Sequence, residues 1–415
     1  MNGRPKILML ITQLSLGGAE RVFYDHLRIF SEHYEVSVCV FTKKGMYDGF
    51  QFSNKIYELD DKFVNSKLKR WRYRKFRLQK IIKDNNIDFC ISHMEGPNFL
   101  NALTKSGCKK ILCVHGSIER NFLKSKMQKN IINKGLIPLL YNRADKIVTV
   151  SEEIKQEHLR AGVKEYKLQC INNFFSLDEI QNKSGEVSDL DGLFSKNNVL
   201  VHVGRLAPEK NQSLLLDILK YFRLNGRTEK LVIIGDGILR NELLLRCKRL
   251  GLKAFEYSEV IPLDETADVY FMGVQANPFK YVAKAKVFLL TSYNEGFPLV
   301  LGESLACGTP VVSIDCYTGP REILSQLDKI YNEAVKEYTA LYCGNLVKYF
   351  ESDKYDEGYL KIWMEAILHI IDDSVEESRL KANSAIKSKQ YEKTLIKKKW
   401  FDLIESFISD KSATA

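Results

Sequence analysis

Short apolar runs alternate with amphipathic segments along the first half of the chain. Apolar runs of this length, separated by helical patterns, are typical of strands in a parallel sheet that is covered by helices. The pattern predicts strands at residues 6–11, 36–41, 89–93, 111–115 and 146–150. A helix is predicted from residue 19 to about residue 33. We expect the first apolar run to be a buried strand rather than a secretion signal.

The same pattern restarts in the second half, after a polar stretch at residues 182–198. This stretch is rich in glycine and acidic residues, and we interpret it as a linker. Strands are predicted after it at residues 199–203, 231–234, 287–291 and 311–314. Helical segments follow the first two of them, so the second half also has the pattern of an α/β domain.

These two series define the predicted domain organisation. We predict two Rossmann-like domains, residues 1–181 and residues 199–389, that face each other across a cleft. The last segment, about residues 392–409, has apolar residues at helical spacing. We therefore expect a C-terminal helix that crosses back, so that residues 390–415 pack on the first domain.

The composition is that of a globular protein. Of the 415 residues, 45% are apolar and 27% charged, which excludes a disordered or collagen-like chain. The net charge of +10 favours acidic partners such as a phosphate compound, nucleic acid or an anionic membrane. The nine cysteines form no C-x-x-C pair and several lie in predicted strands, so we expect reduced thiols and a cytoplasmic protein. No apolar run is long enough to span a membrane.

The strongest chemical signal is the segment 294–312. Glu295 lies on a turn after a predicted strand, and a helix is predicted to begin near Pro298. Glu303 follows Glu295 by eight residues, about two helical turns, so both carboxylates can face one cleft.

The start of this predicted helix can itself bind a ligand. Helix N-termini present unpaired N–H groups and the positive end of the dipole, which attract anions or sugar hydroxyls. Pro298 has no N–H group, so the expected donors are the amides of Gly296, Phe297 and Leu299.

A second motif follows the first strand of the second domain. Arg205 and Lys210 lie five residues apart on the loop after residues 199–203. Arg offers a planar fork and Lys a mobile point charge, so the two can converge on one diphosphate.

Two features of the first half lie where α/β folds bind ligands. Gly17 and Gly18 follow the first strand, where they allow close approach of the backbone to a ligand, although G-x-G-x-x-G is absent. His115, followed by glycine, ends an apolar strand at the carboxyl edge of the sheet. His93 is placed similarly but is less specific.

Residues 67–83 form a strongly basic segment. They contain nine Lys or Arg and no acidic residue, with aromatic residues interleaved. A solvated helix face is the simpler interpretation. The alternative, which we prefer, is a segment that lies on anionic lipid.

Together these residues resemble the retaining glycosyltransferases of family GT4, which have the two-domain GT-B fold. The resemblance covers most of the chain. It rests on the E-x7-E of Glu295 and Glu303, on the G-R-x4-K that contains Arg205 and Lys210, and on the G-G-A-E-R turn. The closer likeness is to bacterial enzymes that add hexoses or N-acetylhexosamines to polyprenyl-diphosphate glycans.

The resemblance implies a role for each motif. Arg205 and Lys210 would hold the donor diphosphate, against which Gly17 and Gly18 would pack. Glu303 would bind the ribose, and Val274 would lie on the nucleotide side. Glu295 and the backbone of residues 296–299 would bind the donor sugar. His115 would lie beside the reacting sugar.

The implied activity is a retaining, metal-independent transfer of a hexose or N-acetylhexosamine from a nucleotide sugar, UDP being the expected nucleotide. The expected acceptor is a polyprenyl-diphosphate-linked glycan, in surface polysaccharide or glycoprotein glycan assembly. No cofactor is implied besides the donor, and the D-x-D at residues 189–191 lies in the predicted linker, away from strand ends. We name no carboxylate nucleophile and therefore expect same-face attack. The expected location is the inner face of the cell membrane, bound peripherally through residues 67–83.

Two other classes of function are less favoured. A GT-B sugar-nucleotide epimerase would bind the donor and transfer nothing, but the E-x7-E within its turn argues against it. A basic nucleic-acid-binding protein has no recognised motif here, and the basic residues are concentrated in one segment. We therefore expect no nucleic-acid partner.

Overall fold

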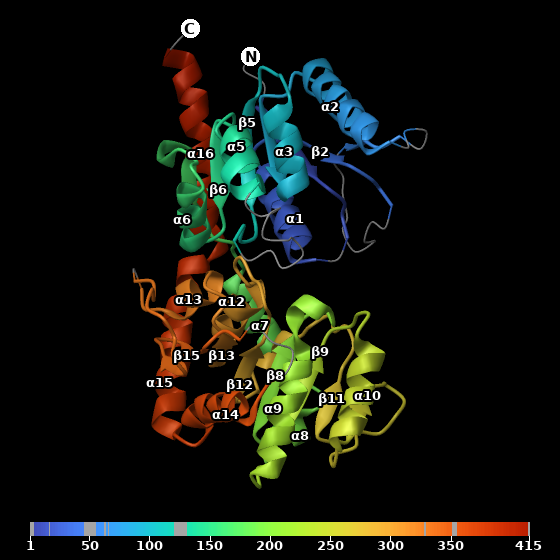
Figure 1. Ribbon diagram of the computed structural model, residues 1–415, viewed down its shortest axis with the longest axis vertical. Helices are drawn as coiled ribbons and strands as arrows, with labels where there is room; N and C mark the ends of the chain where they lie inside the picture. The colour runs from blue at the N-terminus through green and yellow to red at the C-terminus, as the bar shows by residue number, and fades with distance from the viewer. Residues whose placement is uncertain are drawn as a thin grey trace. The chain divides into compact units, whose positions relative to one another are not determined.

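The computed structural model describes residues 4–15, 17–44, 55–61, 64, 66–119, 131–327, 329–350 and 355–413. The chain divides into two compact units (Figure 1). The first comprises Met1–Asn173 with Ile396–Ala415, and the second comprises Phe174–Leu395. Each is built around one sheet, as the alternating pattern predicts.

The sheet of the first unit has seven strands in the order β3-β2-β1-β4-β5-β6-β7, and all its pairings are parallel. The strands are β1 (Lys6–Ile11), β2 (Glu35–Val40), β3 (Ile56–Glu58), β4 (Phe89–His93), β5 (Lys109–Val114), β6 (Lys146–Thr149) and β7 (Leu168–Cys170). The helices are α1 (Gly18–Ser31), α2 (Lys67–Asp84), α3 (Glu95–Leu103), α5 (Ile137–Tyr141), α6 (Glu152–Arg160) and α16 (Lys393–Ala413), with a π-helical turn at Ile132–Leu136 and a 3₁₀ turn at Glu165–Lys167.

The C-terminal helix α16 belongs to the first unit from Ile396 onward, which confirms the expected crossing back. Its Trp400 is buried and packs edge-on against His26 of α1, with ring centroids 4.7 Å apart. Trp400 also contacts Phe30 of the same helix at 5.6 Å. This aromatic contact explains why a segment distant in sequence completes the first domain.

The sheet of the second unit has eight strands in the order β10-β11-β9-β8-β12-β13-β15-β14, and only β14 runs antiparallel. The strands are β8 (Val199–Val203), β9 (Lys230–Ile234), β10 (Ala254–Glu256), β11 (Val269–Phe271), β12 (Val287–Leu290), β13 (Val311–Ile314), β14 (Tyr338–Ala340) and β15 (Gly344–Val347). The helices are α7 (Leu177–Ser184), α8 (Asp191–Lys196), α9 (Gln212–Leu224), α10 (Arg240–Leu250), α11 (Phe279–Val282), α12 (Leu299–Ala306), α13 (Gly319–Leu324), α14 (Glu357–Ile371) and α15 (Ser374–Ser388), with 3₁₀ turns at Pro208–Lys210 and Lys389–Tyr391.

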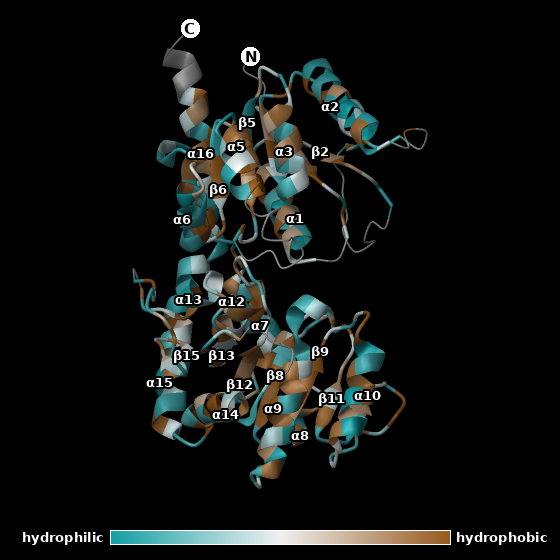
Figure 2. Ribbon diagram, in the orientation of Figure 1, coloured by the Kyte–Doolittle hydropathy of each residue, from teal (hydrophilic) through white to brown (hydrophobic). Residues whose placement is uncertain are grey.

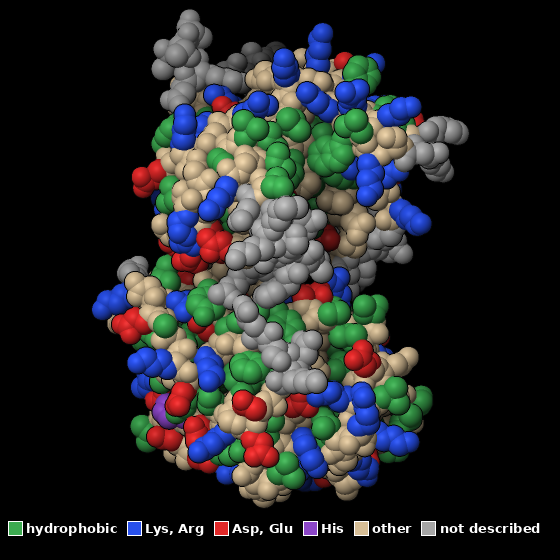
Figure 3. Space-filling model, viewed as in Figure 1, with side chains coloured by type: hydrophobic (Ala, Val, Ile, Leu, Met, Phe, Trp, Pro, Cys, Tyr) green, Lys and Arg blue, Asp and Glu red, His purple; other side chains and the backbone are tan. Residues whose placement is uncertain are grey.

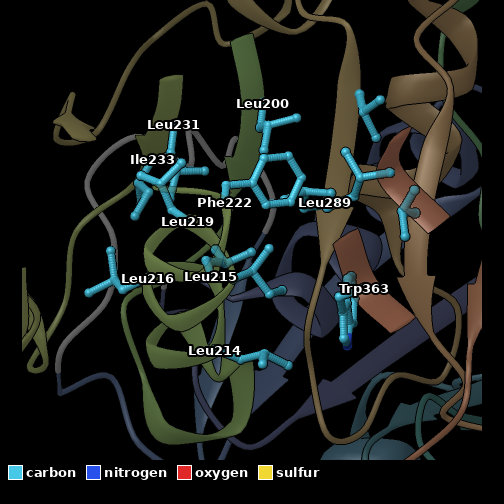
Figure 4. Close-up of a cluster of buried hydrophobic side chains, with 14 of the residues drawn as sticks. Leu200, Leu214, Leu215, Leu216, Leu219, Phe222, Leu231, Ile233, Leu289 and Trp363 are labelled. Carbon is cyan, nitrogen blue, oxygen red and sulfur yellow. The ribbon is translucent and has the colours of Figure 1, made fainter. Parts of the chain in front are cut away.

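Helices α9 and α14 contact each other and supply much of the apolar core of the second unit. Phe222 of α9 and Trp363 of α14 are fully buried, with Leu200 and Leu289 of the central strands in the same cluster (Figure 4). The strands are correspondingly hydrophobic along their length (Figure 2). Strands of a parallel sheet that are covered on both faces have this character.

The polar stretch 182–198, which we interpreted as a linker, is not a linker between the two units. It lies inside the second unit, which begins at Phe174, and it contains the end of α7 and all of α8. Leu190 and Leu193 are fully buried there. Apart from these two, the side chains of the segment are mostly polar, so polar residues dominate the sequence pattern.

Candidate functional site

The residues predicted to bind the donor lie along one edge of the second sheet. Parallel strands end at the same edge, where α/β proteins bind ligands. Strands β11, β9, β8, β12 and β13 are consecutive in the sheet. Val274 follows β11, Arg205 and Lys210 follow β8, and Glu295 follows β12. The fold therefore brings three separate sequence motifs to neighbouring strand ends.

Lys210 and Glu295 form an ion pair that joins two of these loops. Lys210 Nζ lies 2.6 Å from Glu295 Oε1, and the two side chains are 25% and 12% exposed. Burial lowers the pKa of Lys210, but the Glu295 carboxylate raises it more, so the net pKa lies above its usual value. The same loops are joined by the Thr291 hydroxyl, which donates to the Lys210 carbonyl oxygen over 3.0 Å. A lysine held in this way stays cationic at neutral pH.

Arg205 is held differently. Its Nη2 lies 2.6 Å from Glu209 Oε1, and both side chains are exposed. Its carbonyl oxygen accepts a hydrogen bond from Gln212 Nε2 over 2.8 Å. Each cation of the loop therefore has its own carboxylate partner, and the convergence of Arg205 and Lys210 on one diphosphate stays a prediction.

Helix α12 begins at Leu299, with Pro298 as its N-cap residue. Glu295 therefore lies before the helix and Glu303 within it. The expected separation of two helical turns, which would let both carboxylates face one cleft, does not apply. Glu303 is buried within α12 at 5% exposure. The Phe297 ring packs edge-on against Tyr391 at 5.0 Å, which fixes the turn between the two glutamates.

The nucleotide-side loop lies beside the end of β9. Gly273 and Gly235 form an isolated bridge, and both have positive φ, at 65° and 132°. A Cβ at Gly235 would lie 2.1 Å from the Gly204 carbonyl oxygen, so only glycine allows this close approach. Val274 follows with its side chain 65% exposed, which leaves it accessible at this edge.

The next loop along the sheet carries a buried ion pair that was not predicted from the sequence. Asp315 follows β13, and both its oxygens accept hydrogen bonds from Arg321 of α13, at 2.7 and 2.6 Å. The sequence signal for it is weak: an acid at the end of an apolar strand, six residues before an arginine.

In the first unit, the two predicted glycines open α1. Gly17 is the N-cap residue, and a Cβ there would lie 2.3 Å from Glu20 Oε2. Gly18 has open space where a side chain would be. Glu20 is buried and accepts a hydrogen bond from the Ser15 hydroxyl over 2.9 Å. The turn thus leaves open space at Gly18, whereas the Glu20 carboxylate fills the space next to Gly17.

His115 lies in a cluster of histidines at the carboxyl edge of the first sheet. Its Nε2 is 2.9 Å from His93 Nδ1, so one of the two rings donates to the other. His26 stands 5.4 Å from His93, ring to ring. Burial lowers the pKa of His115 to about 4 and that of His26 to about 3. Both are therefore neutral at pH 7, and His93, less favoured from the sequence, is the direct partner of His115.

A buried carboxyl group fixes the loop that follows His115. Glu157 of α6 accepts a hydrogen bond from the Ser117 hydroxyl over 2.6 Å and one from the Ile118 amide over 2.9 Å. Burial raises the pKa of Glu157 to about 7. No sequence signal distinguishes this glutamate from the solvated ones on the same helix.

The basic segment is the helix α2. Leu78, Ile81 and Ile82 are buried against the sheet, whereas Leu68 and Phe76 are 65% and 62% exposed. The exposed basic residues of the helix are Lys67, Lys69, Arg72, Lys80 and Lys83. Figure 3 shows Lys and Arg side chains around hydrophobic ones on this side of the first unit.

Two arginines of α2 are not part of that exposed face. Arg74 pairs with Asp60 through two hydrogen bonds of 2.6 and 2.8 Å and lies 4.0 Å from the Phe41 ring. Arg70 donates to the Val64 carbonyl oxygen. These two hold the helix in place. In the described part of the chain, no helix combines the length and hydropathy needed to cross a membrane.

Two family models match the chain, one to each half. Residues 16–179 match the model "Glycosyltransferase Family 4", and residues 189–341 match "Glycosyl transferases group 1". An uncharacterized glycosyltransferase of Methanocaldococcus jannaschii is 28% identical, covering 95% of this chain and 98% of the relative. A Campylobacter jejuni relative is 30% identical, covering 85% of this chain and 92% of its own. It is named an N-acetylgalactosamine-N,N'-diacetylbacillosaminyl-diphospho-undecaprenol 4-alpha-N-acetylgalactosaminyltransferase.

Solved structures share the fold over almost the whole length. Anabaena HepE in complex with UDP aligns with a TM-score of 0.70 at 17% identity, covering 97% of this chain and all of that one. The lipopolysaccharide outer core galactosyltransferase WaaB aligns with a TM-score of 0.66 at 20% identity, covering 97% of this chain and 99% of that one. These matches confirm the predicted fold of two Rossmann-like domains.

Proposed function

Because this chain belongs to the glycosyltransferases, with a family 4 first half and a group 1 second half, we propose that it transfers a hexose or an N-acetylhexosamine from a UDP sugar to a polyprenyl-diphosphate-linked glycan. The first unit takes the acceptor and the second takes the donor. The acceptor class is supported by the Campylobacter relative, whose name specifies a diphospho-undecaprenol substrate.

The Lys210–Glu295 pair is the observation that carries the donor assignment. It places a permanent cation and a carboxylate on adjacent strand ends, with the 2.6 Å contact linking the two motifs. The cation suits the donor diphosphate, and the carboxylate, with the amides at the start of α12, suits hydroxyl groups of the sugar. Arg205 on the same loop supplies a second cation.

The roles of the basic residues in this transfer follow from the charges that develop as the bond to the donor sugar breaks. Cleavage of the sugar–phosphate bond leaves negative charge on the diphosphate and positive charge on the anomeric carbon. Lys210 and Arg205 stabilise the leaving group, and one preorganised donor of this kind is typically worth roughly 3–4 kcal/mol. The acceptor hydroxyl then attacks from the face that the diphosphate leaves, and its proton passes to an oxygen of the departing diphosphate. Attack on this face retains the anomeric configuration.

We assign His115, with His93 as its hydrogen-bond partner, a place beside the reacting sugar. Their rings are neutral at pH 7 because burial lowers both pKa values. A neutral imidazole beside the reacting sugar offers a hydrogen bond without adding charge to the electron-deficient anomeric carbon. Gly18 leaves space for the diphosphate at the start of α1.

The helix α2 gives the first unit a surface for a lipid-linked acceptor. Exposed Leu68 and Phe76 lie among exposed lysines and Arg72, the combination that favours an anionic lipid surface. We therefore place the protein at the inner face of the cell membrane, bound peripherally.

A transfer assay tests the proposal. Purified protein is incubated with nucleotide sugars, UDP sugars first, and with polyprenyl-diphosphate-linked glycans, and products are identified by mass spectrometry and by the anomeric configuration in NMR spectra. We expect one donor to extend a lipid-linked acceptor with retention. Conversion of the donor in the absence of any acceptor would instead indicate an epimerase.

A further inference from the structure

The loop between β13 and α13 contacts the backbone of the donor turn. The Thr318 hydroxyl donates a hydrogen bond to the Glu295 carbonyl oxygen. The Gly319 amide donates one to the Gly296 carbonyl oxygen over 3.1 Å. A Cβ at Gly319 would lie 2.7 Å from that oxygen and 2.7 Å from Phe297 Cα. The two backbones are therefore in close contact, so a shift of one displaces the other.

The Asp315–Arg321 pair closes this loop. Its side chains are 1% and 10% exposed, and the bidentate contact fixes both the distance and the orientation of the two groups. Asp315 also accepts a hydrogen bond from the Tyr317 amide over 3.1 Å. The pair thus bridges the beginning of the loop and the first turn of α13.

The backbone between the two charges is strained. Tyr317 has a φ of 62°, in the left-handed region that a bulky aromatic residue rarely adopts. Its ring lies under the Arg321 guanidinium, 4.6 Å from ring centroid to Cζ. A conformation of this kind persists only where the surrounding contacts hold it, and it is often found at functional sites.

We propose that Thr318 is a positioning residue for the donor-sugar turn, and that the Asp315–Arg321 pair holds Thr318 in place. The hydroxyl fixes the carbonyl of Glu295 and thereby the direction of its carboxylate and of the amides that follow. This inference rests on the proposed donor role of Glu295. It adds a group that acts through the turn without touching the sugar.

Two single variants at Thr318 test this role. Thr318→Val removes the hydroxyl at nearly constant volume and leaves the Glu295 carbonyl without that donor. We expect kcat/KM for the nucleotide sugar to fall about tenfold, while KM for the acceptor stays within twofold. Thr318→Ser keeps the hydroxyl and is expected to remain within twofold of the unaltered protein. A merely structural role would not produce this split between donor and acceptor.

Thr309→Val is the matched control. Thr309 lies at the opposite end of β13, is fully buried, and donates its hydroxyl to the Val282 carbonyl oxygen over 2.7 Å. Its removal likewise takes a hydroxyl donor from a carbonyl oxygen, although the Val282 oxygen still accepts a hydrogen bond from the Ala285 amide over 3.1 Å, so thermal stability should fall in both valine variants. We expect kcat/KM for the donor to stay within twofold in T309V.

Glu295→Gln separates this inference from the function on which it rests. If E295Q uses the donor normally, the donor role of the turn is wrong and the positioning role is wrong with it. If E295Q is impaired but T318V matches T309V in donor kcat/KM, only the positioning role is overturned. If T318V does not fold, Thr318→Ala carries the same comparison.

Discussion

The two sheets present polar side chains at the same edge, yet the groups differ in kind. The edge of the first sheet carries His93 and His115, stacked with ring centroids 5.1 Å apart. The edge of the second carries Lys210 against Glu295 and Asp315 against Arg321, each joined by a contact of 2.6 Å. One topology thus supports a neutral aromatic site and a charged one.

The difference follows from the partners of each buried group. A buried charge is tolerated only when it is paired, and each of the two ion pairs at the second edge joins a cation to a carboxylate. Histidines without a carboxylate partner lose their charge on burial. This division fits donor chemistry in the second unit and a lipid-linked sugar acceptor in the first.

Loss of the Lys210 charge is the largest effect that we expect. Lys210→Ala should lower kcat on the order of 10²-fold or more, because a preorganised cation at the leaving group is removed. The control is Lys286→Ala, since Lys286 precedes β12 at the opposite edge of the same sheet and pairs with Glu377 at 2.9 Å. Initial rates with saturating donor measure both. Turnover of K210A within threefold of K286A would contradict the charged-edge assignment.

The strands of this protein could be predicted wherever an apolar run was four or more residues long and central in the sheet. β1 and β8 occupy the predicted residues. The edge strands β3 and β10 are three residues long and only partly buried, so their sequences carry no comparable pattern.

The site was predictable where a loop motif carried the chemistry. Lys210 and Glu295 each belong to a recognisable motif, but their contact depends on the pairing of β8 with β12, which no local pattern encodes. Thr318 and Glu157 were not predicted for the same reason. Each forms its hydrogen bond with a loop that is distant in sequence, and neither differs from the ordinary polar residues of its own segment.

Neutralising the exposed face of α2 should have the next largest effect. The variant Lys69→Gln with Arg72→Gln removes two exposed charges of α2. A basic residue near an anionic lipid surface is worth about 1 kcal/mol, so binding to anionic vesicles should weaken roughly 30-fold. Lys248→Gln with Arg249→Gln, two exposed residues of α10 in the second unit, is the control. Vesicle sedimentation at low salt measures both pairs. Equal weakening in the two variants would mean that net charge, rather than the α2 face, attracts the lipid.

Acid should destabilise the first unit before the second. Burial lowers the pKa of His26, His93, His115 and His158 in the first unit, but only that of His202 among the described histidines of the second. Such a group stabilises the fold above its unfolded pKa of about 6.5, and this contribution is lost as pH falls, by about 2 kcal/mol per fully buried histidine at pH 5.

One carboxyl group of the first unit acts in the opposite direction. The pKa of Glu157 is raised to about 7, so its protonation adds stability as pH falls from 7 toward 4.5 and offsets one histidine. Hydrogen-exchange protection factors for peptides of each unit, measured at pH 7.5, 6.5 and 5.5, report the net change in the stability of each unit. Equal loss of protection in the two units would show that the histidines of the first sheet are not held neutral by the fold.

Chelation of divalent cations is the change for which we expect the smallest effect. In the proposed reaction Lys210 and Arg205 would bind the leaving diphosphate and together supply the positive charge that a bound metal would otherwise provide. The D-x-D acids serve other contacts: Asp191 lies 2.5 Å from Lys284 Nζ, and Asp189 lies 3.7 Å from Lys280 Nζ. Activity in excess EDTA should therefore equal that in buffer alone. Loss of activity that Mn²⁺ or Mg²⁺ restores would show that the charged edge of the second sheet is incomplete without a cation, and that its two basic residues do not balance the diphosphate by themselves.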